Sequence, residues 1–334
     1  MCKCMLQGYL VIGIILLMTG CQGFQSEKKM GYCFDAAFDP YRMRLYVAAG
    51  KAGLHTLDVV DNQLRYVSTY YDGGYYRNLE LRGNLMYIAD TERGLVVLDV
   101  SGDLPKTVYV QEGHGAGLFI DGDTLYLAAG DDGLQIFDIT RPESPRMVSQ
   151  IGSFGQSWDV WAHKGFAYVA AINTGLIVLD VSKPTKPQYL SSISWDEQNP
   201  MAEVIYGEGE YVYIAAGKHG LVGVDVADPF HPTITAKYNP GPESFGEGVF
   251  VKENMIYLAV GDKRNRDDNG LQILDATNPY SLVLLAKLNF DDWVEGVFVA
   301  GRDAFITNTF SGVRYADVGN PKDIRLIDHF AVIP

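Results

Sequence analysis

The chain has 334 residues, of which 47% are hydrophobic, and its 27 Lys and Arg against 41 Asp and Glu give a formal charge of −14. The hydrophobic fraction excludes wholesale disorder, and the strongly negative charge argues against a nucleic acid as partner. The length allows two average domains or one large all-β domain, and 36 Gly, 21 Tyr and 15 Phe favour many turns between aromatic-rich strands.

The first 21 residues predict a secretory signal. Lys3 precedes a short apolar run over residues 10–18, which small residues follow. The run is about half as long as a bilayer-spanning helix requires. The sequence MTGC at residues 18–21 resembles the lipobox of bacterial lipoproteins, except that Met18 stands where the motif usually has Leu. The resemblance implies that residues 1–20 are removed and that Cys21 is lipidated, while a secreted protein cleaved nearby and an uncleaved anchor remain as alternatives.

This leader predicts where the protein is found. A lipidated Cys21 would place it in the bacterial cell envelope, and we expect the outer membrane, on either the periplasmic or the surface side. Residues 21–30 are polar and predict a short tether. After processing, only Cys21 and Cys33 would remain, and lipidation would occupy the first, so no disulfide framework and no zinc cluster are expected.

A single pattern recurs seven times between residues 31 and 334, which we predict to form one domain. Each copy contains Gly, then Leu or Val, three further residues and Asp. The glycines are Gly53, Gly94, Gly133, Gly175, Gly220, Gly270 and Gly312, about 43 residues apart on average. Seven copies with one internal spacing make repeat architecture the first inference about the fold.

Each copy predicts four short antiparallel strands. In the fourth copy, residues 158–165 form the first strand, 166–175 the second with a turn, 176–187 the third with a turn, and 188–193 the fourth. Four strands in a repeat of this length predict a seven-bladed β-propeller, with each blade contiguous in sequence. An open solenoid is the rival, but it usually needs polar capping repeats, which neither end provides.

The recurring Gly and Asp have a structural explanation. Glycine between the second and third strands permits a positive φ. The aspartates can accept backbone N–H bonds in the turn after the third strand: Asp58, Asp99, Asp138, Asp180, Asp225, Asp275 and Asp317. A catalytic or metal-binding ring is the functional alternative, but sevenfold recurrence favours turn architecture.

These motifs resemble those of a known family. GLVVLDVS (94–101), GLQIFDITRPESP (133–145) and GLIVLDVSKPTKP (175–187) resemble the LVIVD repeat, a β-propeller repeat common on secreted and surface proteins of bacteria. The likeness covers roughly residues 32–330 and implies the fold, but the family offers no shared catalytic residues to carry over. Blades one, two and seven depart from the pattern at the turn between the third and fourth strands.

The start of each first strand predicts a binding face at the mouth of the central channel. Residues there differ between blades while core positions repeat, as a recognition site on a symmetric scaffold would. The expected face for a polar or cationic ligand, or for a partner's side chains, consists of Arg77, His114, Trp158, Asp159, Glu203, Glu247, Trp293 and Glu295. The alternative is a water-filled channel lined by solvated polar groups.

The loop at residues 261–270 is longer than its counterparts. Asn265, Asp267 and Asn269 followed by Gly270 match the opening of a calcium loop, but Ala276 stands where the closing Glu belongs. The candidate calcium site is therefore weak. A protruding interaction loop and a tolerated surface insertion are the alternatives.

The sequence contains no nucleophile elbow, zinc-protease motif or phosphate-binding loop. We therefore expect a non-catalytic binding scaffold without a cofactor, whose partner is another envelope protein or an extracellular polymer. The alternative is a hydrolase or lyase on a polysaccharide or other polymer, with channel carboxylates such as Glu247 and Glu295 as acid and base. A purely structural envelope component is the third possibility.

Overall fold

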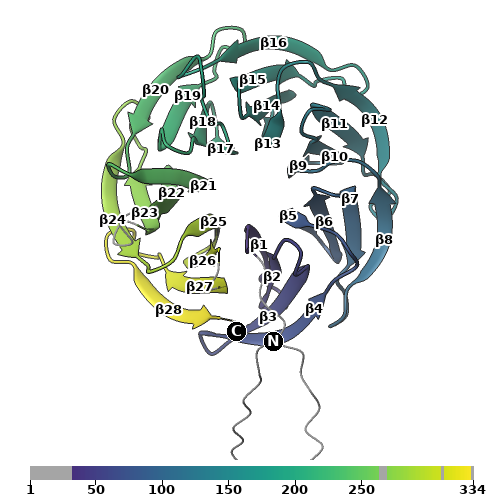
Figure 1. Ribbon diagram of the computed structural model, residues 1–334, viewed down its shortest axis with the longest axis vertical. Helices are drawn as coiled ribbons and strands as arrows, with labels where there is room; N and C mark the ends of the chain where they lie inside the picture. Colours follow the sequence, from purple (N-terminus) through teal and green to yellow (C-terminus); the bar gives the residue numbers. More distant parts are fainter. Residues whose placement is uncertain (1–31, 263–268, 310–311, 332–334) are drawn as a thin grey trace, which may run out of the picture.

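The computed structural model describes residues 32–262, 269–309 and 312–331. Within these ranges the chain forms seven four-stranded antiparallel sheets, arranged as blades around a central axis (Figure 1). The predicted seven-bladed propeller is therefore confirmed. None of the described segments forms a helix that could cross a bilayer. The predicted leader, Cys21 and the tether lie outside the described residues.

Each blade takes its strands from one stretch of the chain, as predicted. Blade one contains β1 (Asp35–Asp39), β2 (Arg44–Ala48), β3 (Leu54–Val60) and β4 (Gln63–Tyr70). Blade two contains β5 (Tyr76–Arg82), β6 (Leu85–Asp90), β7 (Gly94–Asp99) and β8 (Lys106–Gln111). Blades three and four contain β9 (Gly117–Asp121), β10 (Thr124–Ala128), β11 (Leu134–Asp138), β12 (Arg146–Ile151), and β13 (Ser157–His163), β14 (Phe166–Ala171), β15 (Gly175–Asp180), β16 (Gln188–Ile193).

The remaining blades repeat this order. Blades five and six contain β17 (Val204–Glu208), β18 (Tyr211–Ala215), β19 (Leu221–Asp225), β20 (Thr233–Tyr238), and β21 (Ser244–Lys252), β22 (Met255–Asp262), β23 (Gly270–Asp275), β24 (Val283–Asn289). Blade seven contains β25 (Val294–Ala300), β26 (Asp303–Asn308), β27 (Gly312–Asp317) and β28 (Arg325–Phe330). The first strand of each blade lies nearest the axis and the fourth lies at the rim (Figure 1).

The hydrophobic core lies between neighbouring blades. The second and third strands are covered on both faces, so they are nearly continuous apolar runs, such as β14 and β15. Ile136 and Tyr126 of blade three pack with Val160, Val169 and Ile177 of blade four in one buried cluster. Because every blade covers its two neighbours, no blade leaves an apolar face uncovered among the described residues.

The recurring glycine is required for two reasons. All seven have positive φ, between 71° and 149°. In addition, a Cβ on Gly175 would lie 2.4 Å from the carbonyl oxygen of Ile193 in the fourth strand. The predicted role of glycine at this turn is confirmed, and the close approach of the fourth strand adds a second constraint.

The recurring aspartate closes the next turn. In six blades it accepts the backbone N–H two residues later, as Asp180 does from Ser182 at 2.9 Å. Blade one differs, since Asp58 instead accepts a bond from Arg44 Nε at 2.8 Å. There β3 continues to Val60, and the chain reverses through Asp61 and Asn62, both with positive φ.

The ring closes by side-chain contacts between blades seven and one. Leu64 donates its backbone N–H to Asp328 at 2.6 Å, and the rings of Tyr66 and Phe330 stack 6.1 Å apart. Within the described residues, no strand from one end completes the sheet of the other. The first and last blades therefore meet as any neighbouring pair does.

Candidate ligand-binding channel

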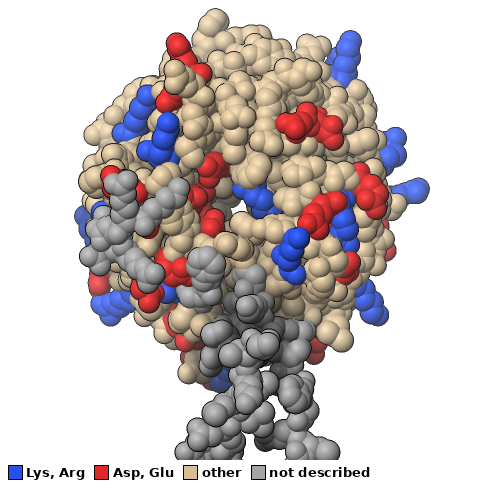
Figure 2. Space-filling view, in the orientation of Figure 1, with Lys and Arg blue, Asp and Glu red and all other residues tan. Residues whose placement is uncertain are grey.

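A central channel of about 570 Å³ runs between the first strands of all seven blades. Figure 2 shows its opening, with acidic side chains along one side, over the inner ends of β21 and β25, and a basic side chain inside. The charged residues that line it, among those described, are Asp35, Arg77, Glu80, Asp159, Glu203, Glu247 and Glu295. Six carboxyl groups therefore face one guanidinium.

Four β-bulges place side chains at the mouth. The register of the first two strands shifts at Arg77, Trp158, Glu247 and Glu295, so each of these residues has no opposite partner in the second strand. A bulge redirects the extra side chain, and here all four line the channel. Glu203 reaches an equivalent place directly before β17, where its backbone N–H binds the carbonyl oxygen of Ala215.

Arg77 extends across the channel towards blades three and four. Its guanidinium donates to the carbonyl oxygens of Ala116 and Trp158, at 3.0 and 3.3 Å, and lies 4.2 Å from the centre of the Trp158 ring. Burial lowers the pKa of Arg77, and the charges of Asp159, Glu203 and neighbouring acids oppose that shift. Arg77 is therefore the positive charge that faces the acids of the channel mouth.

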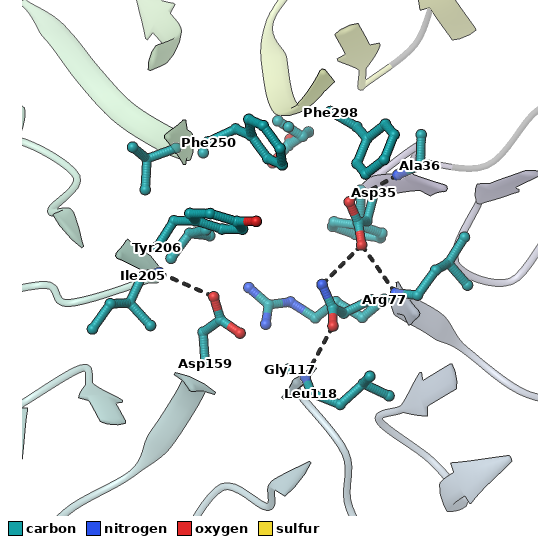
Figure 3. Close-up of a pocket in the computed structure, with 18 of the residues that line it drawn as sticks. Asp35, Ala36, Arg77, Gly117, Leu118, Asp159, Ile205, Tyr206, Phe250 and Phe298 are labelled. Atoms are coloured by element: carbon teal, nitrogen blue, oxygen red, sulfur yellow. Dashed lines mark hydrogen bonds between the residues drawn. The ribbon is translucent and has the colours of Figure 1, made fainter. Parts of the chain in front are cut away.

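Two channel-facing polar groups connect the first three blades. Asp35 accepts the backbone N–H of Leu79 at 2.9 Å and the side-chain amide of Asn78 at 2.8 Å. Asn78 in turn accepts the backbone N–H of Leu118 at 2.9 Å (Figure 3). These bonds join β1 to β5 and β5 to β9 near the channel mouth.

Asp159 makes the same connection between blades four and five. Its side chain accepts the backbone N–H of Ile205 at 3.0 Å (Figure 3). The equivalent positions in blades three, six and seven are Gly117, Gly248 and Gly296. A Cβ on Gly248 would lie 2.6 Å from the carbonyl oxygen of Glu295. In six of the seven blades this position therefore holds either a short polar side chain or a glycine, whereas blade five has Val204 there.

Burial changes the acid strength of these carboxyl groups. It raises the pKa of Asp35 to about 6 and that of Asp159 to about 7, although backbone N–H donors and the Arg77 charge oppose both shifts. Burial also raises the pKa of Glu295, whose carboxylate accepts a bond from the Thr309 hydroxyl at 2.7 Å. Asp35 and Asp159 would thus titrate close to neutral pH.

A second level of the channel lies three residues further along each first strand. Its channel-lining members are Ala37, Glu80, Phe119, Tyr206, Phe250 and Phe298. They share one register position, opposite the second-strand residues Tyr46, Tyr87, Tyr126, Tyr213, Tyr257 and Phe305. This level was not predicted from the sequence, although its members follow the mouth positions at a constant offset of three residues.

Six of the eight predicted face residues line the channel: Arg77, Trp158, Asp159, Glu203, Glu247 and Glu295. His114 is not among the lining residues. It contacts the carbonyl oxygen of Thr91 through Nδ1 at 2.8 Å and packs on the backbone of Gly130. Trp293 also lies away from the lining, against Gly261 and 5.8 Å from the ring of Phe245.

The candidate calcium loop is only partly described. Asn265 and Asp267 lie outside the described residues. Asn269 is buried, and its side-chain oxygen accepts the backbone N–H of Asp262, which occupies that oxygen in the turn. In the described parts of the chain, no group of three or more His, Cys, Asp or Glu is arranged to hold a metal ion.

Comparison with protein families identifies the repeats. The LVIVD repeat model matches residues 73–103, 112–151, 154–194, 201–240 and 246–290, together more than half of the chain. The chain belongs to the LVIVD repeat family. The matches cover blades two to six, so the resemblance at blades one and seven rests on the structure.

Solved structures agree on the fold alone. A computationally designed protein, Ika8, gives a TM-score of 0.65 at 11% identity, covering 90% of this chain and 89% of that one. Saccharomyces cerevisiae Sqt1 gives 0.64 at 11% identity, covering 91% and 87%. The β-propeller domain of Cps50 (Swd1) from Myceliophteria thermophila gives 0.66 at 10% identity, covering 83% and 93%. Comparison with curated proteins gives no match.

Proposed function

We propose that this LVIVD-repeat protein is a non-catalytic binding scaffold that recognises a positively charged segment of an envelope protein or extracellular polymer at the channel mouth. The observation that carries this proposal is the charge distribution of the mouth. Glu203, Glu247 and Glu295 come from three consecutive blades, whereas Arg77 and Trp158 contact each other on the other side.

Such a mouth favours a cationic partner for electrostatic reasons. Arg77 already lies among four acids, so a further cation would face an excess of negative charge. Glu247 and Glu295 lie on strands of packed blades, and Glu203 directly precedes β17. Binding would therefore cost little ordering entropy in the protein.

We further propose that the scaffold is held at the envelope by lipid on Cys21. The supporting observation is the leader, with its short apolar run and the MTGC sequence at residues 18–21. We propose that the lipid anchors the protein in the outer membrane.

The test of the mouth is a pull-down from native membranes with matched variants. Glu247→Gln together with Glu295→Gln removes two rim charges while keeping side-chain shape. Glu143→Gln together with Glu210→Gln makes the same charge change at exposed positions in turns outside the channel. We expect the first variant to lose the retained partner about tenfold, and the second to keep it. Equal retention by both variants would remove the mouth as the binding site.

The proposed lipid anchor is tested separately by mass spectrometry of the intact N-terminus, with Cys21→Ser as control. A diacyl or triacyl Cys21, absent from the variant, would support the anchor. An unmodified N-terminus would refute it without affecting the binding proposal.

One observation favours the hydrolase or lyase as a second candidate, namely that Asp35 and Asp159 titrate near neutral pH. Both side chains, however, accept backbone N–H groups of the next blade, which fixes them in a structural role. Release of reducing ends or unsaturated products from envelope polysaccharides, lost in Asp159→Asn, would favour the enzyme over the scaffold.

A further inference from the structure

Glu80 is the carboxylate of the deep channel level, on β5. It lies within the protein and is reached only in part, from the channel that it lines. The other acids of the channel have donors or a cation near them: Asp35 and Asp159 accept backbone N–H groups, and Glu295 accepts a hydroxyl. The structure gives the Glu80 side chain no hydrogen bond or ion pair within the described residues.

Aromatic rings form much of the wall around this level. Tyr206 and Phe250 have ring centres 4.6 Å apart, and Phe250 and Phe298 have centres 5.5 Å apart. Figure 3 shows these three side chains pointing into the cavity from β17, β21 and β25. Phe119 continues the wall on β9.

Arg77 does not neutralise Glu80. The charges that act on Glu80 are those of Asp35 and Asp159, both negative, whereas the Arg77 charge acts on Asp35, Asp159 and Glu295. The mouth therefore has a counter-charge in Arg77, whereas the Glu80 carboxylate of the deep level has no such counter-charge among the described residues.

We propose that the deep channel level binds a small organic cation of the ammonium class, with Glu80 as its counter-charge and the rings of Tyr206, Phe250 and Phe298 against its alkyl groups. Aromatic faces attract cations, most strongly where water is excluded. A hard metal ion would need several oxygen ligands, which one carboxylate among phenyl rings does not supply. This site is separate from the proposed partner site at the mouth.

The first test compares choline with its neutral isostere 3,3-dimethyl-1-butanol by calorimetric titration of the chain from residue 21 to residue 334, at about pH 9. We expect choline to bind and the neutral alcohol to bind at least about tenfold more weakly, because the two molecules have the same shape but only choline is positively charged. Equal binding of the two would show an apolar cavity only. Failure of choline to bind would overturn the proposal.

Variants assign the binding to the deep level. Glu80→Gln should lose choline binding about tenfold or more, and Phe250→Leu should weaken it by a smaller factor. Glu143→Gln, at an exposed turn, serves as the matched control and should bind as the parent does. The rim variant Glu247→Gln with Glu295→Gln should keep choline binding within about threefold, which separates this site from the mouth. Unchanged binding in Glu80→Gln would contradict the assignment.

The pH dependence provides an independent readout, since a quaternary ammonium keeps its charge at every pH. Burial, with Asp35 and Asp159 adding to it, raises the pKa of Glu80 to about 8. Asp35 and Asp159, with pKa values of about 6 and about 7, lose their protons at lower pH, and Tyr206, whose pKa burial raises to about 12, stays neutral. Choline affinity should therefore rise between about pH 7 and pH 9, and this rise should be much smaller in Glu80→Gln. A flat profile in the parent protein would contradict the role of Glu80.

Discussion

At the scale of single residues, Glu80 shows how strongly its surroundings change the pKa of a carboxyl group. On the surface a glutamate has a pKa near 4.5, whereas burial in the channel raises it to about 8. A carboxyl group whose pKa is higher in the folded protein than in the unfolded chain stabilises the fold less as pH rises between the two values. Glu80 therefore costs stability at alkaline pH.

Glu80→Gln should raise the melting temperature at about pH 9 and change it little at about pH 5, because at the lower pH the folded parent already holds the proton. Thermal unfolding followed by circular dichroism across this range would measure the difference. Glu143→Gln, which alters an exposed charge, should shift the melting temperature by a similar small amount at both pH values. A Glu80→Gln effect independent of pH would contradict the raised pKa.

The repeat glycines are a second residue-scale feature. Gly175→Ala should destabilise the protein by about 2–4 kcal/mol, since the methyl group meets both a positive φ and the Ile193 carbonyl oxygen. Gly122→Ala is the matched control, with a φ of 57° and open space around its Cβ position. It should cost only about 1 kcal/mol. Urea unfolding of both variants gives the comparison, and equal losses would mean that backbone conformation alone explains the glycine.

At the scale of elements, the first strands are joined near the channel by short polar side chains. Asn78 links β5 to both neighbours, since it donates to Asp35 and accepts from Leu118. Its position in a first strand could be predicted from the sequence. The two hydrogen bonds of Asn78 could not be predicted in this way, because both partners lie about forty residues away and contact Asn78 only in the folded ring.

Asn78→Ala should destabilise the protein by about 1–3 kcal/mol, because it leaves the Leu118 N–H without its acceptor and removes one of the two donors to Asp35 Oδ2, which keeps the Leu79 N–H. Asn289→Ala, at an exposed position on the rim strand β24, should stay within about 0.5 kcal/mol of the parent. Chemical unfolding would measure both. A loss at Asn78 no larger than that at Asn289 would mean that water replaces these bonds.

The bulges are the other element-scale feature. Arg77, Trp158, Glu247 and Glu295 line the channel because each is an extra residue in its strand. The sequence alignment of blades placed these residues at strand starts, but it did not reveal the bulges. His114 and Trp293 were predicted to lie with them, whereas His114 packs on Gly130 and Trp293 on Gly261 of β22, away from the channel lining.

At the scale of the whole molecule, the ring is closed without exchange of a strand between the first and last blades. The ends of the described chain lie near each other, where β28 meets β4 (Figure 1). The seam contains the same kinds of contact as other blade junctions, including a shared apolar cluster with Phe38 and Phe305. The position of the chain ends is therefore not what holds the ring together.

A circular permutant that joins Ala331 to Tyr32 by a flexible linker and opens the chain between Glu197 and Gln198, in the exposed loop before β17, should fold. We expect a cooperative melt and a β-sheet spectrum like those of the parent. Opening the chain within blade four, between β14 and β15, is the comparison and should cost more stability. An unfolded first permutant with a folded second one would show that the native seam is needed.

The sequence by itself determined the blade count, the four-strand unit and the residues of most turns, because these follow from local patterns repeated seven times. Gly175 and Asp180 could be assigned their roles from neighbours a few positions away. Only the tertiary structure decided the deep channel site, because Glu80, Tyr206, Phe250 and Phe298 come from four blades and meet only when the ring closes. Burial in that ring, rather than residue type, also decided which carboxyl groups titrate near neutral pH.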